Sequence, residues 1–421
     1  MSDNRSPRRH SLRRNVVTLL SGSLTAQLAT VAALPILSRL FDPVSFGEYT
    51  IFLSVTALLA VLATLRYEMA IVLPRSNREA AAIKRLGNMI MALACGVITV
   101  VALTFTLAGP SMSTGWKLLV ILLGPGTLLL GLNSMLSYWL MRINRYAALS
   151  ASRITQSFTT ATAQILIGLA ADNSAIGLIA GFLVGQLAAF ILMSLADTSR
   201  AYKRDQRSSR QWTYLLRKHW RFPAMTTPQS IVDAIQMNGI NLAIGYVSFS
   251  ALGQYSQAWR LVSFPVGLIG STLGQVYYPE LANTPRRDLF QVARKAVARA
   301  LAIGFFPFLL MFFLSPTVIP WLLGEQWVLA GLYAQALTPW LYLVLAASPM
   351  STVFVVLNKQ KVGLIFSIFY AVIPIVILVL LRDDLYVAIV ALSLAKTVML
   401  VINLGIILWY ARFAATNTGA G

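Results

Sequence analysis

The stretch from Leu34 to Pro74 reads LPILSRLFDPVSFGEYTIFLSVTALLAVLATLRYEMAIVLP. It predicts two apolar helices joined by a very short turn, the second of which carries Arg66 and Glu68 near its far end. A charge within a segment long enough to cross a hydrocarbon layer is costly, so it marks either a water-filled cavity or a helix end at the interface. The role of the protein depends on which of these applies.

The composition is that of a membrane protein. Of the 421 residues, 57% are hydrophobic and 11% are charged, whereas soluble domains contain about 25% charged residues. The mean hydropathy is +0.71. The first apolar run, Val16–Ser38, is longer than the roughly 7–15 residues of a signal-peptide core, so we expect it to be the first membrane span.

Apolar stretches recur along the whole chain, each near the roughly 20 residues that a helix needs to cross a bilayer. They predict an all-α polytopic membrane protein with twelve transmembrane helices, at residues 16–38, 47–73, 86–109, 116–140, 148–171, 174–196, 222–247, 253–279, 297–321, 328–357, 361–381 and 385–411. The largest inner loop divides these spans into two six-helix lobes. The expected parts are a basic tail (1–15), a first lobe (16–196), a basic linker (197–221), a second lobe (222–411) and a tail (412–421).

The basic residues alternate with the predicted spans. With the N-terminus inside, 28 of the 34 Lys and Arg residues fall in inner segments, 3 in outer loops and 3 within spans. Cytoplasmic loops of membrane proteins are enriched in Lys and Arg, so both termini are expected in the cytoplasm. The net charge of +20 then reflects topology and lipid headgroups, with no need for nucleic acid. Amphipathic stretches within 197–221 and at 288–299 are expected to lie on the membrane surface.

The two halves are related at one turn. Phe46-Gly47-Glu48-Tyr49, at the outer turn between spans one and two, corresponds to Leu252-Gly253-Gln254-Tyr255 between spans seven and eight, 206 residues later. Two six-helix halves of the same orientation indicate parallel repeats about an axis along the membrane normal, an arrangement of transporters.

Polar side chains concentrate in the span at 222–247. Gln229, Asp233, Gln236 and Asn241 lie near one helical face, and two prolines in the first turns predict a kinked or broken helix. Such a stripe avoids lipid, so it either lines a hydrated lumen or forms hydrogen bonds between helices.

Cations outnumber carboxylates inside the predicted membrane region, which favours an anionic passenger. Arg260 faces the lumen or snorkels outward, and Lys396 is the most deeply placed charge. Arg66 and Glu68 are two residues apart on a predicted helix, so we expect them to point to different sides and not to form a simple pair. The candidate cations are Arg39, Arg66, Arg260 and Lys396, and the candidate carboxylates are Asp233, Glu68 and Glu48.

Enzymatic signatures are missing from the sequence. His10 and His219 lie in basic segments without Cys or carboxylate neighbours at metal-ligand spacing. There is no nucleophile elbow, no Walker A loop and no long outer loop. We therefore expect no enzyme, no cofactor and no metal.

The pattern LSRLFDPVSFGEY at residues 37–49, followed by Arg66-Tyr67-Glu68 and Leu73-Pro74, resembles the Wzx-type polysaccharide (O-antigen repeat-unit) flippases. These belong to the multidrug/oligosaccharidyl-lipid/polysaccharide exporter superfamily. The resemblance implies a V-shaped bundle of two lobes in the bacterial cytoplasmic (inner) membrane, which alternates between inward-open and outward-open states. The implied passenger is an undecaprenyl-pyrophosphate-linked oligosaccharide for lipopolysaccharide or exopolysaccharide synthesis.

The resemblance also implies roles for particular residues. Arg66 and Arg260, and less directly Lys396, would accompany the pyrophosphate or acidic sugars, while Glu68 and Asp233 are candidates for ion coupling. Expected partners are the lipid-linked oligosaccharide, membrane lipids, and a polysaccharide polymerase with its chain-length machinery. A drug or cation antiporter of the same superfamily is the alternative. An integral-membrane enzyme such as a repeat-unit polymerase would need a long outer loop with catalytic residues, and none is present.

Overall fold

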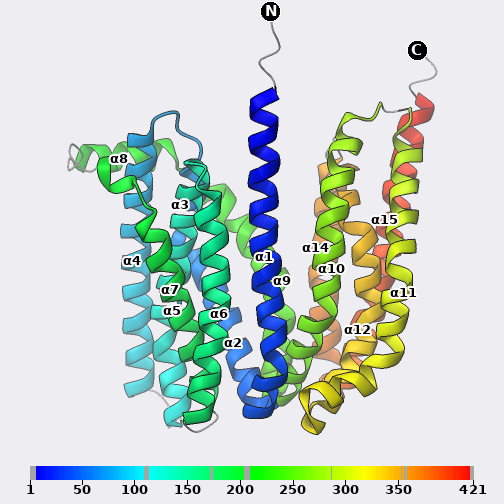
Figure 1. Ribbon diagram of the computed structural model, residues 1–421, viewed down its shortest axis with the longest axis horizontal. Coiled ribbons are helices and arrows are strands. Elements are labelled where there is room, and N and C mark those ends of the chain that lie inside the picture. The colour runs from blue at the N-terminus through cyan, green and yellow to red at the C-terminus, as the bar shows by residue number, and fades with distance from the viewer. Residues whose placement is uncertain are drawn as a thin grey trace, which may run out of the picture. The chain divides into compact units, whose positions relative to one another are not determined.

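The computed structural model describes residues 6–108, 113–170, 174–202, 209–285, 287–351, 353–354, 357 and 359–417, which form helices and no strands (Figure 1). The helices of the first half are α1 (Ser6–Leu40), α2 (Pro43–Thr64), α3 (Tyr67–Ala70), α4 (Asn77–Ala108), α5 (Thr114–Arg142), α6 (Tyr146–Ala170), α7 (Ala175–Leu195), the 3-10 turn Ser199–Tyr202 and α8 (Ser209–Lys218). Those of the second half are a π-helical turn (Phe222–Thr226), α9 (Thr227–Val247), α10 (Phe249–Asn283), α11 (Leu289–Leu323), the 3-10 turn Glu325–Trp327, α12 (Val328–Ala347), the 3-10 turn Ser348–Ser351, α14 (Gln360–Leu380) and α15 (Leu385–Asn417).

The predicted all-α polytopic fold is confirmed. Within the described ranges, nine helices are long and apolar enough to cross a membrane: Thr18–Leu40, Pro43–Thr64, Asn77–Ala108, Thr114–Arg142, Ala175–Leu195, Leu289–Leu323, Glu325–Ala347, Lys361–Leu380 and Leu385–Phe413. The other three predicted spans correspond to α6, α9 and α10, which are 25, 21 and 35 residues long but are too polar to satisfy the same hydropathy criterion. The count of twelve spans stays a prediction.

Two compact units make up the chain, Met1–Asn238 and Gly239–Gly421. In unit 1, α6 packs most extensively against α7 and α1, while α5 contacts α2, α4 and α7. In unit 2, α12 is the common partner of α10, α11 and α15. The chain passes from one unit to the other within α9, whereas the sequence predicted lobes separated by the linker at 197–221; that division stays a prediction.

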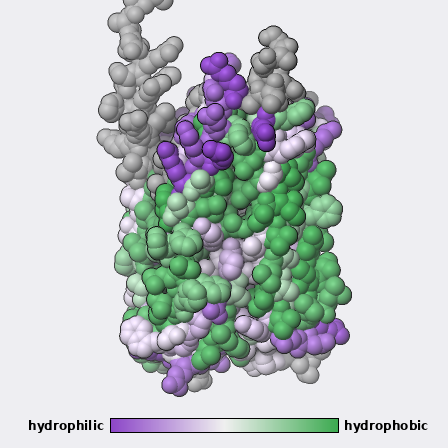
Figure 2. Space-filling view, turned by 90° about the vertical axis from the view of Figure 1, so that its right-hand side faces the viewer, coloured by the Kyte–Doolittle hydropathy of each residue, from purple (hydrophilic) through white to green (hydrophobic). Residues whose placement is uncertain are grey.

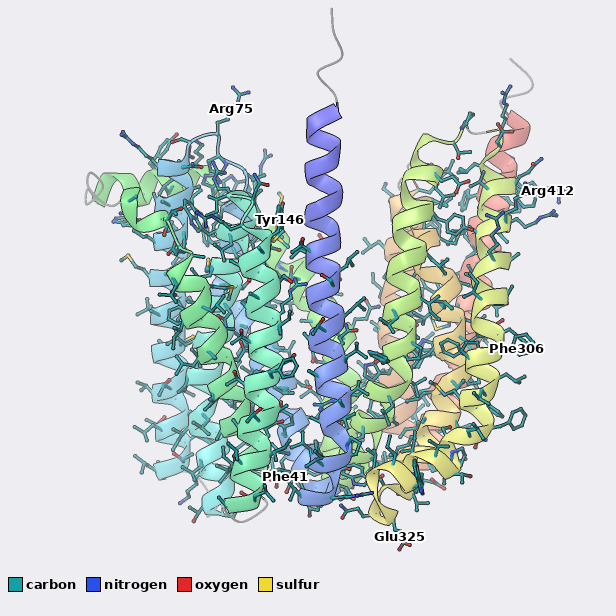
Figure 3. The ribbon with its side chains drawn as sticks, in the orientation of Figure 1. Phe41, Arg75, Tyr146, Phe306, Glu325 and Arg412 are labelled. Atoms are coloured by element: carbon teal, nitrogen blue, oxygen red, sulfur yellow. The ribbon has the colours of Figure 1, made fainter. Side chains whose placement is uncertain are left out.

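The outer surface of the helices is that of a protein surrounded by lipid. Figure 2 shows a broad hydrophobic band between hydrophilic ends on the face that it displays. On α11, the exposed side chains include Phe306, Phe313 and Trp321. Within unit 1, Arg75 and Tyr146 lie at the end opposite Phe41 (Figure 3). Such an apolar belt needs hydrocarbon rather than water around it.

The short turn between the first two helices is confirmed, and its position is refined. It lies between Leu40 and Pro43, so the helix begins before the predicted turn at 46–49. Asp42 caps α2, because its Oδ1 accepts a hydrogen bond from the Ser45 amide at 2.8 Å.

The same capping geometry recurs 206 residues later. Ser248 caps α10, and its Oγ accepts a hydrogen bond from the Ala251 amide at 3.2 Å. Both caps bond the amide three residues on, and they are separated by the spacing that relates the two sequence motifs. The internal repeat therefore extends from residue identity to local backbone structure.

Three predicted elements differ in the structure. The span at 47–73 ends at Thr64, because the backbone turns left-handed at the next two residues. The stretch at 288–299 is not a separate surface helix but the first turns of α11, with Leu289, Ala293 and Ala296 fully buried against other helices. The span at 328–357 is interrupted, since α12 ends at Ala347 and a 3-10 turn follows.

Candidate functional site

The first candidate site lies where α2 breaks. Leu65 and Arg66 have φ angles of 46° and 57°, and α3 begins directly after them. Left-handed backbone at residues other than glycine costs about 1–3 kcal/mol each and is retained where surrounding structure enforces it, often at functional sites. The break ends a helix whose apolar pattern otherwise continues.

Arg66 and Glu68 form an ion pair, contrary to the sequence-based expectation. Arg66 Nη1 lies 3.2 Å from Glu68 Oε1. On a continuous helix, side chains two residues apart diverge by about 200°, but the left-handed residues turn the Arg66 side chain towards Glu68. The prediction was wrong because it assumed an unbroken helix.

This ion pair is asymmetric in its exposure and only partly satisfied. The side chain of Glu68 is 2% exposed, whereas that of Arg66 is 24% exposed. Among the described residues, Glu68 Oε2 and Arg66 Nε have no hydrogen-bond partner. Tyr138 on α5 is close enough to interact electrostatically with both charges. Buried polar atoms normally have partners, so these two atoms make the pair a candidate functional site.

Arg142 fastens the segment that follows α3 to the end of α5, a contact that the sequence did not reveal. Its Nη1 donates hydrogen bonds to the carbonyl oxygens of Ile71 and Val72, both at 3.1 Å, and its Nε donates to Asn77 Oδ1 at 3.0 Å. The sequence assigned Arg142 only to the count of inner charges. In the structure it also satisfies carbonyl groups just beyond the C-terminus of α3, where helical hydrogen bonding ends.

The second candidate site surrounds Lys396 in α15. Its Nζ lies 4.4 Å from the ring centroid of Trp340 and 4.0 Å from that of Tyr370. Trp340 Nε1 donates a hydrogen bond to the Tyr370 hydroxyl at 2.5 Å, which fixes the two rings relative to each other. Lys396 is 3% exposed, and no carboxylate of the described residues forms an ion pair with it. Aromatic faces stabilise a cation without cancelling its charge.

Other polar residues of unit 2 lie along α10. Arg260 is half-buried. Gln257 is fully buried, and neither atom of its side-chain amide has a hydrogen-bond partner among the described residues. Tyr255 stacks on Trp259, which in turn packs against Trp340. An aromatic layer therefore connects α10 to the surroundings of Lys396.

The polar stripe of α9 divides between the units. Gln229 and Asp233 are exposed and Gln236 is half-buried in unit 1, while Asn241 is half-buried in unit 2. The expected irregularity at the start of this segment is present as the π-helical turn Phe222–Thr226. Whether these four side chains line a lumen stays a prediction.

The remaining predicted charges lie near the turn between α1 and α2. Arg39, in the last turn of α1, is exposed, and Glu48 in α2 is half-buried. An exposed arginine at a helix end fits an interface anchor as well as a substrate contact.

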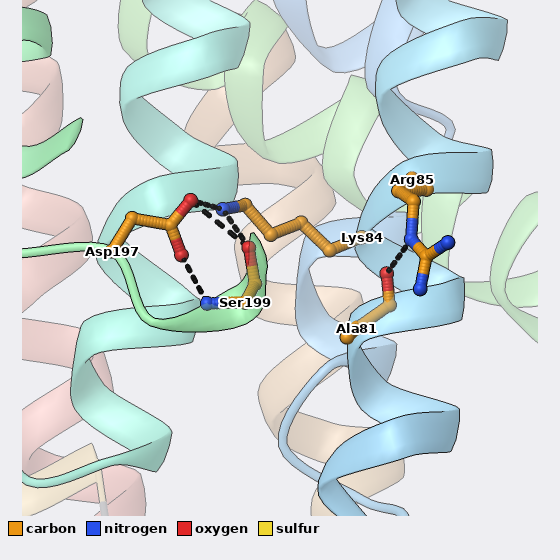
Figure 4. A network of polar contacts seen from close by, with 5 residues as sticks. All are labelled: Ala81, Lys84, Arg85, Asp197 and Ser199. Atoms are coloured by element: carbon orange, nitrogen blue, oxygen red, sulfur yellow. Dashed lines mark hydrogen bonds and ion pairs between the residues drawn. The ribbon is translucent and has the colours of Figure 1, made fainter. Parts of the chain in front are cut away.

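A buried polar network ties the linker to α4 (Figure 4). Lys84 Nζ lies 2.5 Å from Asp197 Oδ2 and donates to Ser199 Oγ at 3.0 Å. The Ser199 amide donates to Asp197 Oδ1 at 2.8 Å. Burial opposes ionisation of Asp197, but the hydrogen bonds from Lys84 and Ser199 outweigh it and hold the pKa of that carboxyl below its usual value. The sequence had assigned Lys84 only to the topology signal.

The amphipathic helix predicted in the linker is confirmed as α8, and one of its faces is docked on unit 1. Leu215 is 2% exposed within an apolar cluster that includes Tyr67 of α3. Lys218 Nζ lies 2.7 Å from Glu79 Oε1, and this hydrogen bond raises the pKa of Lys218. His219 Nε2 lies 3.4 Å from the same oxygen. His219 is thus accounted for by a structural contact.

The fold is that of a multi-pass membrane protein. Across the described residues, no group of three or more His, Cys, Asp and Glu side chains is placed to hold a metal ion. The family model for "Polysaccharide biosynthesis protein" matches residues 36–330. The chain belongs to this polysaccharide biosynthesis family, as its resemblance to the Wzx-type flippases predicted.

Solved structures with the same fold come from the exporter superfamily. The lipid II flippase MurJ in an inward closed conformation has a TM-score of 0.72 and 14% identity, covering 95% of this chain and 91% of that one. An inward-facing multidrug resistance MATE transporter of the MOP superfamily has a TM-score of 0.70 and 15% identity, covering 96% and 99%. A MOP superfamily transporter from Pyrococcus furiosus, described as having a binding pocket of reverse polarity, has a TM-score of 0.53 and 12% identity over 97% and 96%. A search of curated protein sequences found no match.

Proposed function

We propose that this protein is a flippase that moves undecaprenyl-pyrophosphate-linked oligosaccharides from the cytoplasmic to the outer leaflet of the bacterial inner membrane by alternating access. These repeat units would serve the synthesis of O-antigen or exopolysaccharide, with a polymerase and its chain-length machinery acting next. Family membership supports a polysaccharide precursor as the passenger. Both termini would be cytoplasmic.

The observation that carries this proposal is the environment of Lys396. The Lys396 ammonium group is buried and lies against the faces of Trp340 and Tyr370, which attract a cation but do not neutralise it. A buried, uncompensated cation is costly unless an anion is present for part of the cycle. A pyrophosphate group or an acidic sugar is such an anion, whereas a cationic drug would be repelled.

Arg66 would supply a second cation for the passenger by leaving Glu68 and binding phosphate oxygens instead. In the structure, Glu68 holds Arg66 at 3.2 Å. Binding of a proton or a metal cation at Glu68 would weaken this pair and free the guanidinium for phosphate oxygens, which arginine binds in a bidentate manner. We therefore favour Glu68 over the exposed Asp233 as the group that couples transport to an ion gradient.

The experiment is complementation in a strain that lacks the gene and has no redundant flippase. We expect the deletion to trap lipid-linked repeat units on the cytoplasmic leaflet, and Lys396→Gln, Arg66→Ala or Arg260→Ala to lower surface polysaccharide at least about tenfold. Lys361→Gln, which removes an exposed charge at the start of α14, is the matched control. Normal surface polysaccharide in the deletion strain would exclude this function.

One observation favours the drug or cation antiporter as the second candidate. Glu68 is buried and one of its oxygens is unpartnered, and a carboxylate of this kind could bind a cationic substrate. The antiporter predicts that expression lowers susceptibility to cationic dyes and that Glu68→Gln abolishes this effect. The flippase predicts no change in susceptibility.

A further inference from the structure

We infer that the outward face of α8, together with Trp220 and Arg221 just after it, is a binding surface for the headgroups of anionic phospholipids. This inference goes beyond the proposed function and does not rest on it. The helix lies across the end of α4 rather than alongside it (Figure 1). An amphipathic helix in this orientation lies in the plane of the membrane interface.

Docking on unit 1 uses only one side of the helix. Leu215 is buried in the apolar cluster, and His219, one turn later, is also buried. Lys218 at the edge of this face is held by Glu79. The position of the helix is therefore set by the protein, and the opposite side is free to meet something else.

The opposite side combines exposed aromatic and apolar groups with basic groups. Leu216 and Trp220 are 40% and 50% exposed. At 100° per residue, Leu216 and Arg217 lie away from Leu215 on α8, and Trp220 lies in the turn that follows the helix. Arg217 and Arg221 are exposed, and neither forms an ion pair with a described residue. The segment 209–221 contains no Asp or Glu.

The chemistry of this surface fits one kind of occupant. Guanidinium groups bind phosphate in a bidentate manner, and tryptophan prefers the boundary between headgroups and acyl chains. A basic residue near an anionic bilayer contributes about fivefold in affinity, since each is worth about 1 kcal/mol. Anionic phospholipid supplies both the phosphate and the apolar layer beneath it, whereas a soluble acidic protein would leave Leu216 and Trp220 without an apolar partner.

The test uses the full chain purified in detergent and fluorescently labelled phosphatidylglycerol, with phosphatidylcholine as the neutral comparison. We expect the double variant Arg217→Gln/Arg221→Gln to weaken retention of phosphatidylglycerol about 10- to 30-fold and to leave phosphatidylcholine unchanged. The matched control is Arg75→Gln/Arg78→Gln, which removes two exposed charges from the segment before α4 and its first turn; we expect a loss below about threefold.

Thermal unfolding of each variant checks that folding is preserved, and Trp220→Ala gives a second route to the same surface. We expect Trp220→Ala to weaken both lipids by a similar factor, because it removes the apolar contact alone. Equal losses in the two double variants would overturn the inference. Unchanged retention of phosphatidylglycerol in Arg217→Gln/Arg221→Gln would also overturn the inference and would favour a protein partner for this face.

Discussion

Replacing Asp197 by asparagine tests whether the linker is fastened to α4 by a buried ion pair. The side chains of Lys84 and Asp197 are 6% and 8% exposed and their charged atoms are 2.5 Å apart. Asp197→Asn leaves the Lys84 ammonium buried and without this carboxylate, while its contacts with Ser199 Oγ at 3.0 Å and the Trp139 ring at 5.7 Å are retained. Removing one partner of a buried pair costs about 3–5 kcal/mol.

The expected loss is large enough to measure by thermal unfolding in detergent. For a unit the size of Met1–Asn238, each kcal/mol shifts the midpoint by about 2–4 °C, so the variant should unfold roughly 6–20 °C lower. The matched control is Glu79→Gln, which breaks the pair with Lys218. Because that lysine is 43% exposed, solvent screens the pair and the expected loss is below about 1 kcal/mol.

A double variant separates loss of the pair from loss of an unpaired charge. Lys84→Met/Asp197→Asn removes both charges, so it should be more stable than Asp197→Asn alone. Two results would refute the reasoning: a shift for Asp197→Asn no larger than that for Glu79→Gln, or a double variant less stable than the single one. The first result would mean that the pair is solvated, and the second that Lys84 stabilises the fold mainly through its other contacts.

Three further predictions follow from contacts in the structure. The pKa of Asp197 is lower in the folded than in the unfolded protein, so its ionisation contributes to the free energy of unfolding. This contribution is complete at neutral pH, falls as the pH drops below about 4 and is lost below the folded pKa. Asp197→Asn should abolish this part of the decrease in stability at acid pH, as measured by unfolding experiments. Gly181→Ala places a Cβ 2.8 Å from the backbone nitrogen of α6 at Gln164 and should cost about 1–3 kcal/mol, whereas a Cβ at Gly96 meets nothing within 4 Å, so Gly96→Ala should leave the midpoint unchanged or raised. Arg66→Leu should destabilise the protein more than Glu68→Leu by about 1–3 kcal/mol. Arg66→Leu leaves the Glu68 carboxylate unpaired at 2% exposure, whereas Glu68→Leu leaves the Arg66 guanidinium unpaired at 24% exposure. Equal losses of stability in the two variants would contradict this asymmetry.

The sequence predicted most of the fold because helix length and hydrophobicity are local properties. A bilayer requires long apolar segments, and these can be counted without tertiary information. The same reasoning could not find the break at Leu65 and Arg66. The residues around it form a strong apolar helical pattern without glycine or proline, so no local signal marks the left-handed turn.

The sequence identified candidate site residues, whose roles stay a prediction, but it could not identify their contacts. Lys396 was identified by its depth in the last span, but its neighbours Trp340 and Tyr370 lie in two other helices. Asp197 lies 113 residues from Lys84. Pairings of this kind depend on how helices pack, which the order of residues along one helix does not specify.

A buried cation can stabilise the fold or, under the proposed function, bind the passenger. The groups that surround the cation, rather than its depth in the membrane, separate these two roles. Lys84 is neutralised by Asp197, so moving it would cost the full ion pair, and it is best kept fixed throughout a transport cycle. Lys396 forms no ion pair with a described residue and lies against two aromatic rings, so an anion of the proposed passenger would gain a partner there without breaking an ion pair of the described part of the chain. Arg66 lies between these cases, since its carboxylate is buried while the guanidinium reaches solvent. Under the proposed function, a cation that exchanges one anionic partner for another would link passenger binding to the state of Glu68, at the helix break within the stretch Leu34–Pro74.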